Sequence, residues 1–175
     1  MNRIMSKILV IAYGNPLRCD DGLAWHAADE LSKESLDKEL LDLEILRTHQ
    51  LTPELAKTVS LSQAVIFIDA AREGAPGEIV SHVIYSQPAS FDASHHFTPS
   101  KVMALAEELY GRRPHAVCIS MVGDNFEHGE VLSQAVVKAL PKLVLAVKNL
   151  AQTRPFSGQT DCVDGRRGKA LKIVG

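Results

Sequence analysis

The sequence has little of what marks the more specialised classes of protein. Its 175 residues include only three cysteines at scattered positions, too few for a disulfide framework or a Cys-x-x-Cys metal site. Such sparse use of cysteine fits a reducing, cytoplasmic compartment. The formal net charge is −2, so the chain has no excess of basic residues to attract a polyanion, and we expect no nucleic-acid partner.

Long apolar runs are also missing. The N-terminal run ends at Tyr13 and is not followed by a small-residue cleavage site, so we interpret it as a strand and not as a signal peptide. No segment approaches the roughly 18 apolar residues that a membrane-spanning helix needs. We therefore expect no association with a membrane.

What the chain does contain is an alternation of strand-like and helix-like segments. Apolar runs rich in β-branched residues, such as KILVIAY and AVIFIDA, are typical of strands that are covered on both faces. Between these runs, apolar residues recur at the spacing of one helix face. Strands are expected at 7–13, 43–48, 64–70, 78–86 and 115–123, and helices from about residues 21, 52, 98 and 133.

This alternation predicts an α/β fold, a three-layer sandwich in which a mostly parallel, mixed, five-stranded twisted sheet carries helices on both faces. The turn at 74–77 is too short for a helical crossover, so strand 78–86 is expected to run antiparallel to its predecessor. Residues 1–152 are predicted to form a single domain. The polar, glycine-rich segment 153–175 is predicted to be a flexible C-terminal tail.

The helix that starts near residue 98 has clear signals at both ends. Thr98 and Pro99 suit the N-cap and the first helical position, and Gly111 suits the C-terminal end. The expected buried stripe of this helix comprises Val102, Leu105, Ala106 and Leu109.

Side chains able to do chemistry gather at the expected carboxyl ends of the strands, where ligands bind in open α/β sheets. Asp20 and Asp21 follow the first strand, and Asp69 ends the third. His95 and His96 lie just before the helix near residue 98, so their loop can bring an imidazole to the same edge. Two carboxylates and one histidine form a three-ligand set that leaves positions on a transition-metal ion open for water or substrate.

Each of these residues also has a plain structural interpretation. Asp20 or Asp21 can cap the following helix, although a cap needs only one acid. Asp69 can simply begin a loop, and the His-His pair can lie in a surface loop. Cys19 has no histidine near it in the sequence to activate it as a nucleophile, so we expect it to be a small buried residue.

Other candidate motifs are weaker. After Gly14 the sequence has no G-x-G-x-x-G, which argues against a dinucleotide site. His26 lies about 140° around a helix from Asp21, so the two do not form a ligand pair. The segment 127–130 is expected to be a solvated turn.

Four stretches together resemble the hydrogenase maturation protease family, the endopeptidases that process the C-terminus of the large subunit of nickel-iron hydrogenases. These stretches are ILVIAYGNPLRCDDGLA, VIFIDA, SHHFTPSKVMALAEELYG and CISMVGDNFEHGEVLSQAVVKALP. The resemblance covers roughly residues 7–150 and leaves the tail outside. The element GN-x-L-x-x-D-[DE]-G is its most specific part.

The resemblance implies a function and a set of site residues. Asp21, Asp69 and His95 would contact nickel, with His96 as the alternative histidine, and Asp20 would orient its loop or cap the helix. The nickel would arrive in the hydrogenase large-subunit precursor, the protein substrate, and act as a recognition element. The family resemblance leaves open whether nickel also polarises the cleaved carbonyl or activates water.

Two other functions remain compatible with the same residues. The chain could be a non-catalytic metal-binding or chaperone-like module that holds the hydrogenase precursor. Alternatively, Asp21 and Asp69 could form the carboxylate pair of a metal-independent hydrolase.

Overall fold

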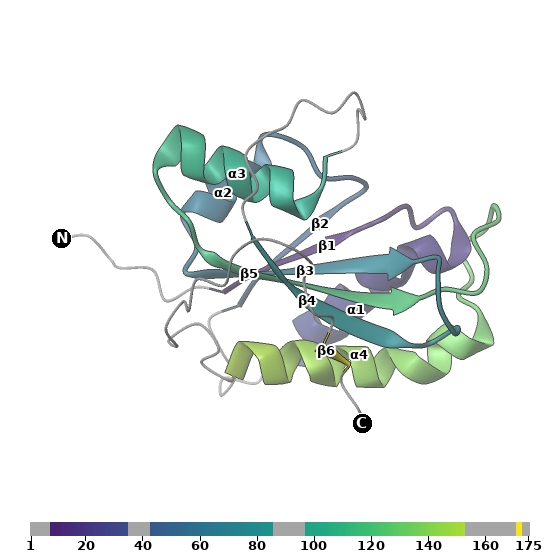
Figure 1. Ribbon diagram of the computed structural model, residues 1–175. Helices are drawn as coiled ribbons and strands as arrows, with labels where there is room; N and C mark the ends of the chain where they lie inside the picture. The colour runs from purple at the N-terminus through teal and green to yellow at the C-terminus, as the bar shows by residue number, and fades with distance from the viewer. Residues whose placement is uncertain (1–7, 35–42, 86–96, 153–170, 173–175) are drawn as a thin grey trace.

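The computed structural model describes residues 8–34, 43–85, 97–152 and 171–172 (Figure 1). Its strands are β1 (Ile8–Tyr13), β2 (Leu43–Thr48), β3 (Ala64–Ala71), β4 (Ile79–Ile84), β5 (His115–Val122) and β6 (Leu171–Lys172). Its helices are the short 3-10 helix η1 (Cys19–Gly22), α1 (Leu23–Glu34), α2 (Leu55–Ser60), α3 (Pro99–Tyr110) and α4 (Gln134–Gln152). The predicted α/β fold is confirmed.

The strands lie in the order β2-β1-β3-β5-β4-β6. The four strands from β2 to β5 in this order are parallel, and β4 is antiparallel to β5. All five predicted strands are therefore present in a mostly parallel, mixed sheet. The short β6 comes from the segment predicted to be a tail and pairs with Val80 and Ser81 of β4, whereas residues 153–170 lie outside the described part of the chain.

The direction of β4 agrees with the sequence-based expectation. The hydrogen-bonded neighbour of β4 is nevertheless β5 and not β3, because β5 lies between them in the sheet. The turn at 74–77 therefore does not close a hairpin of adjacent strands. The chain passes from β3 across the end of β5, and β4 then lies on the other side of β5 within the same sheet.

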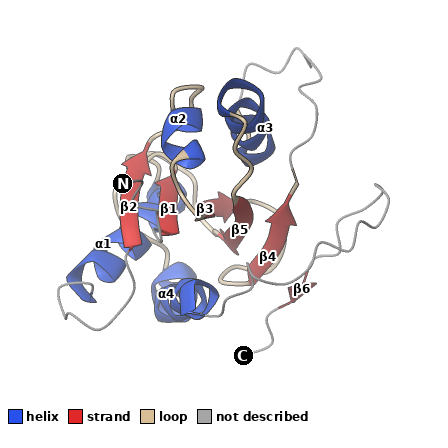
Figure 2. Cartoon of the chain, turned by 90° about the vertical axis from the view of Figure 1, so that its left-hand side faces the viewer, coloured by secondary structure: helices blue, strands red, loops and turns tan. Residues whose placement is uncertain are grey.

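Helices cover both faces of the sheet (Figure 2). Helices α1 and α4 lie on one face, and α2 and α3 lie on the other. Because side chains alternate along a strand, β3 contributes Ile66 and Ile68 to the first core and Val65 and Phe67 to the second. Among the described helices, none is both long and apolar enough to cross a membrane.

Helix α3 begins and ends where the sequence indicates. The Thr98 side chain accepts a hydrogen bond from the backbone N–H of Lys101, and Gly111 adopts the left-handed conformation at the C-terminal end. The expectation that Leu109 is buried is wrong, because its side chain is 62% exposed. Residues 107–110 are all exposed, so the last turn of α3 extends beyond the surface against which the helix packs.

Candidate functional site

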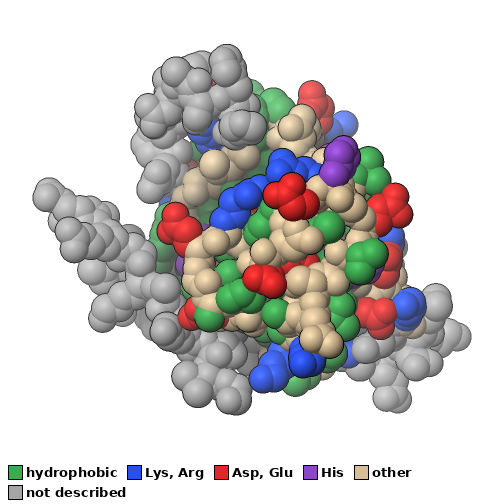
Figure 3. Space-filling view, turned by 90° about the vertical axis from the view of Figure 1, so that its right-hand side faces the viewer, with side chains coloured by type: hydrophobic (Ala, Val, Ile, Leu, Met, Phe, Trp, Pro, Cys, Tyr) green, Lys and Arg blue, Asp and Glu red, His purple; other side chains and the backbone are tan. Residues whose placement is uncertain are grey.

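The candidate site lies at the carboxyl ends of the parallel strands, on the face shown in Figure 3. Acidic and basic side chains are mixed over this face and do not form a field of one sign (Figure 3). Two loops form the part of this edge next to α1 and α4. The first connects β1 to α1 and contains the two adjacent acids, and the second, residues 123–133, connects β5 to α4.

The first loop folds back on itself at Gly14. This residue has a φ of +143°, and a Cβ atom there would lie 2.0 Å from the backbone oxygen of Asp21. Only glycine permits such an approach. The fold-back lets the Asp21 carboxylate accept a hydrogen bond of 2.9 Å from the backbone N–H of Asn15, which fixes a partly buried acid at the end of β1.

Asp20 turns the other way and is fully buried. One carboxylate oxygen accepts hydrogen bonds from the backbone N–H groups of Asp124 and Asn125, at 2.8 and 2.9 Å, and the other accepts one from Ser133 at 2.7 Å. Burial alone would raise the pKa of this carboxyl, but the three donors outweigh that effect and hold its pKa below the ordinary value. Asp20 therefore orients a loop, as one of its expected roles required, and does not cap α1.

Further backbone contacts join the two loops. The N–H of Cys19 donates to the carbonyl of Gly129 at 2.7 Å, and the N–H of Gly129 donates to Leu17 at 3.0 Å. The Arg18 guanidinium donates to the carbonyl of Phe126. Cys19 is buried in this junction, with its Sγ 2.9 Å from where a Cβ of Gly129 would lie, so its role is to fill space between the loops.

Asp69 ends the buried part of β3 on the face that carries α2 and α3. Burial raises the pKa of its carboxyl to about 6, with a smaller contribution in the same direction from the charge of Asp21. Hydrogen bonding from the Tyr13 hydroxyl and the Ala70 backbone N–H acts against this rise. The structure thus brings Asp21 and Asp69 close enough for their charges to interact.

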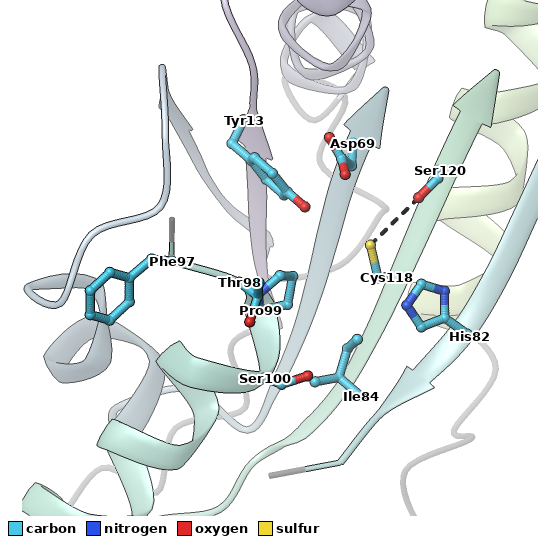
Figure 4. A pocket seen from close by; sticks show the side chains of 10 residues that line it. All are labelled: Tyr13, Asp69, His82, Ile84, Phe97, Thr98, Pro99, Ser100, Cys118 and Ser120. Atoms are coloured by element: carbon cyan, nitrogen blue, oxygen red, sulfur yellow. Dashed lines mark hydrogen bonds between the residues drawn. The ribbon is translucent and has the colours of Figure 1, made fainter. Parts of the chain in front are cut away.

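A pocket of about 380 Å³ opens beside Asp69 (Figure 4). The sheet provides its floor, with side chains from four strands. These side chains are Tyr13 from β1, Asp69 from β3, His82 and Ile84 from β4, and Cys118 and Ser120 from β5. The opposite wall consists of Phe97 and the start of α3 at residues 98–100.

The polar groups on the pocket floor influence one another. Tyr13 points toward Asp69 (Figure 4), and burial together with the neighbouring Asp69 and Cys118 raises the pKa of its hydroxyl. Burial likewise raises the pKa of the Cys118 thiol to about 12, so this thiol is protonated at neutral pH. The Cys118 sulfur lies 3.7 Å from the Ser120 hydroxyl.

The sequence analysis did not identify Tyr13, His82, Cys118 or Ser120 as site residues. A signal for three of them was available, because alternation along β3 and β5 puts Cys118 and Ser120 on the same face as Asp69 once the strands are paired. His82 lies opposite Cys118 in the antiparallel pairing. This information depends on strand register, which the sequence alone does not provide.

The predicted histidine ligands, His95 and His96, lie outside the described residues. Phe97, the next residue in the chain, lines the pocket that contains Asp69. In the part of the chain that the structure describes, no three His, Cys, Asp or Glu side chains are grouped as a metal site requires. Asp21 and Asp69 are thus the two oxygen donors of the predicted ligand set that lie within the described residues.

Segment 127–130, expected to be a solvated turn, is mostly exposed but anchored. His128 Nδ1 lies 3.0 Å from the carbonyl oxygen of Leu17, and the backbone of Gly129 bridges to Arg18. These contacts belong to the junction between the two loops. His128 thus has a structural contact at the junction of the two loops.

Comparison with known proteins gives matches among solved structures. No family model and no curated protein sequence matches the chain. The structure of a NiFe hydrogenase maturation protease, HybD from Thermococcus kodakarensis, is 22% identical, with a TM-score of 0.63 over 83% of this chain and 99% of that one. The hydrogenase maturating endopeptidase HybD from E. coli is 19% identical, with a TM-score of 0.68 over 85% of this chain and 94% of that one.

A third structure, the NiFe hydrogenase maturation protease HycI from Thermococcus kodakarensis, is 18% identical, with a TM-score of 0.66 over 85% of this chain and 94% of that one. At these identities the likeness concerns the fold. The fold that the sequence resemblance implied is confirmed, and it is the fold of these hydrogenase maturation endopeptidases.

Proposed function

We propose that this chain is an endopeptidase that removes the C-terminal extension of a nickel-iron hydrogenase large-subunit precursor after nickel insertion. The observation that carries the proposal is that Asp21 lies close enough to the partly buried Asp69 for their charges to interact, beside a pocket at the carboxyl edge of a sheet whose fold is shared with maturation endopeptidases. The sequence motifs, which resemble the same family, support it independently.

In this proposal Asp21, Asp69 and His95 contact the nickel that the precursor carries, with His96 as the alternative to His95. Two carboxylates and one imidazole are a weak and incomplete set for nickel. Such a set suits a metal that is presented by a substrate and not retained by the enzyme. Nickel then acts as a recognition element, because only a precursor with its metal in place can complete the contacts.

The surroundings of the two acids support a cationic ligand. Burial disfavours the ionised form of Asp69, and a cation next to the carboxylate would offset that cost. Asp20 does not compete for the ligand, because both of its oxygens are engaged by the 123–133 loop. Its contacts hold the loop that carries Asp21, which preorganises one of the two donors.

The proposed place of action is the cytoplasm, and the proposed partner is a folded protein precursor. The small number of cysteines, two of them buried and unpaired, supports a reducing compartment. The near-neutral charge supports a protein substrate over a nucleic acid.

The test uses the purified full-length chain and a hydrogenase large-subunit precursor prepared with and without nickel. We expect the intact mass of the nickel-loaded precursor to fall by the mass of its C-terminal extension, and the metal-free precursor to stay unchanged. Absence of shortening of the loaded precursor, after active processing by a known maturation protease as control, would contradict the proposal.

The same experiment separates the two other candidate functions. A metal-binding or chaperone-like module would form a complex with the loaded precursor without changing its mass. A metal-independent hydrolase that uses Asp21 and Asp69 as a carboxylate pair would shorten the metal-free precursor as well, and would do so in the presence of a chelator.

A further inference from the structure

The pocket beside Asp69 is larger than a contact with one metal ion requires. Its volume of about 380 Å³ lies within the range of ligand pockets, roughly 300 to 1,000 Å³. It extends from Asp69 across β5 to His82 and Ile84 on β4. Most of this space is therefore available to something other than the metal.

Side-chain size on β5 explains why the space exists. On the face toward α3, β5 presents the small side chains of Cys118 and Ser120, whereas the adjacent β3 presents Phe67 and β1, one strand further along the sheet, presents Tyr13. Helix α3 begins at Pro99 and packs over the inner part of this face, and no other described helix packs over its carboxyl end. The small side chains on the floor, next to the start of α3, leave room for the pocket.

The lining has two kinds of surface. Hydroxyl, thiol and imidazole groups of Tyr13, Ser120, Cys118 and His82 face the pocket from the sheet, and Ile84, Phe97 and Pro99 add apolar surface (Figure 4). Among the described residues that line the pocket, Asp69 is the only carboxylate and none is lysine or arginine. With Asp69 engaged by a metal, this lining suits an uncharged peptide segment with apolar side chains and hydrogen-bonding backbone groups.

We infer that the pocket binds the stretch of the precursor polypeptide beside the cleaved bond and selects for uncharged side chains there. The inference rests on the proposed function and adds a second recognition element to the nickel. Its occupant follows from continuity, because Asp69 belongs to both the proposed nickel contact and the pocket wall. A polypeptide that presents its metal to Asp69 must continue along this wall or away from the protein.

The structure provides a matched set of variants to test this inference. His82 and Ile84 face the pocket from β4, at a distance from Asp21 and outside the proposed metal contacts. Val83, between them in the same strand, points to the opposite face by strand alternation and is 48% exposed. His82→Trp and Ile84→Trp would fill the pocket, and Val83→Trp adds the same bulk on the other face.

The kinetic prediction concerns the nickel-loaded precursor. We expect the filled variants to need about tenfold more precursor for half-maximal rate, with a maximal rate within about twofold of the wild type, since a ground-state contact is lost. The Val83→Trp variant should match the wild type in both quantities. Wild-type kinetics in the two filled variants, with their folds verified by circular dichroism and thermal unfolding, would overturn the inference.

A second measurement does not depend on cleavage. A metal-free synthetic peptide that spans the cleaved bond is titrated into the isotope-labelled full-length protein, and methyl resonances are followed. We expect shifts at Ile84 that saturate, with no shift at the exposed Leu109 on α3, and loss of the shifts in His82→Trp. If the wild type cleaves the precursor but shows no such shifts, the inference that the pocket binds the polypeptide is wrong and the proposed function stands. If the wild type never cleaves the precursor, the proposed function itself is wrong.

Discussion

Asp20 and Asp69 lie at the same edge of the sheet, and burial acts to raise the pKa of both carboxyls. The net pKa shifts of the two carboxyls are nevertheless opposite. Asp20 accepts three backbone hydrogen bonds, which together hold its pKa below the ordinary value. Asp69 has fewer donors, the Tyr13 hydroxyl and one backbone N–H, and its pKa stays raised, at about 6. Both carboxylate oxygens of Asp20 thus accept hydrogen bonds from backbone N–H groups of the protein.

The role of an acid at this edge of the sheet depends on how many hydrogen bonds its carboxylate oxygens accept from the protein. A carboxylate whose oxygens are all engaged by backbone groups stabilises the fold and is closed to a ligand. A desolvated carboxylate with free acceptor capacity, beside a second acid and a pocket, gains from a cation or a proton. The two adjacent acids after β1 differ in the same way, because Asp20 belongs to the first kind, whereas Asp21 is only partly buried and its charge reaches Asp69.

The largest expected effect in this comparison concerns Asp21. Asp21→Asn removes one proposed nickel contact but keeps an amide oxygen that can accept from the Asn15 N–H. We expect processing of nickel-loaded precursor to fall on the order of 100-fold or more, because the precursor's nickel loses one of its contacts and the bound precursor is misplaced. Quantitative mass spectrometry of precursor and product measures this rate.

The control for Asp21→Asn is Glu108→Gln, which neutralises an exposed acid on the outer side of α3. This variant should process the precursor at the wild-type rate. Full processing by Asp21→Asn would remove Asp21 from the site.

The next effect concerns the folded state. Asp20→Asn leaves at least one of the three backbone N–H groups facing an amide NH₂, so we expect the free energy of unfolding to drop by about 3 kcal/mol. Urea unfolding at pH 7 measures the loss. Asp124→Asn, at an exposed neighbouring position, should change the value by no more than about 0.5 kcal/mol.

The contribution of Asp20 also has a defined pH window. Because the pKa of its carboxyl is lower in the folded state, its stabilisation is present above the ordinary aspartate pKa of about 3.9 and is lost as the pH falls through the lower folded value. The stability gap between wild type and Asp20→Asn should be constant near neutrality and close only in acid. A gap that closes near pH 6 would mean that another group accounts for it.

The smallest effect concerns the donor to Asp69. Tyr13→Phe removes a hydroxyl whose hydrogen bonding lowers the pKa of the Asp69 carboxyl, so we expect that pKa to rise further. Carboxyl-carbon NMR titration measures it directly. We also expect a loss in processing of about tenfold, as for other groups that orient a metal-binding carboxylate, and an unchanged Asp69 titration would contradict the contact.

Much of this architecture could be predicted from local sequence. The apolar runs of β1, β3 and β5 predicted these strands because strands buried on both faces need continuous apolar residues. The start and end of α3 followed from Thr98, Pro99 and Gly111, whose effects on the backbone are local. The exposed Leu109 was missed because helical periodicity tells which face is apolar and not how far the packing surface extends.

The site was only partly predictable, because several of its contacts join residues that are far apart in the sequence. Asp21 and Asp69 were predicted as candidate site residues from their positions at strand ends. The partners of Asp20 lie more than a hundred residues away in the β5–α4 loop, so its role as a loop anchor could not be read locally. The pocket depends on strand register and on which side chains are small, and β5 enters between β3 and β4 against the order of the sequence.

The most direct test of the contrast is Asp69→Asn, with stability and processing measured on the same preparation. A carboxyl with a folded pKa near 6 destabilises the fold when ionised, so the variant should be more stable than wild type by about 1 to 3 kcal/mol at pH 8. That gain should shrink as the pH falls through 6 and vanish only below the ordinary aspartate pKa of about 3.9, where the wild-type carboxyl is protonated in both the folded and the unfolded state. The account predicts a more stable protein that no longer shortens nickel-loaded precursor, and a variant that is less stable, or that still processes it fully, would contradict the account.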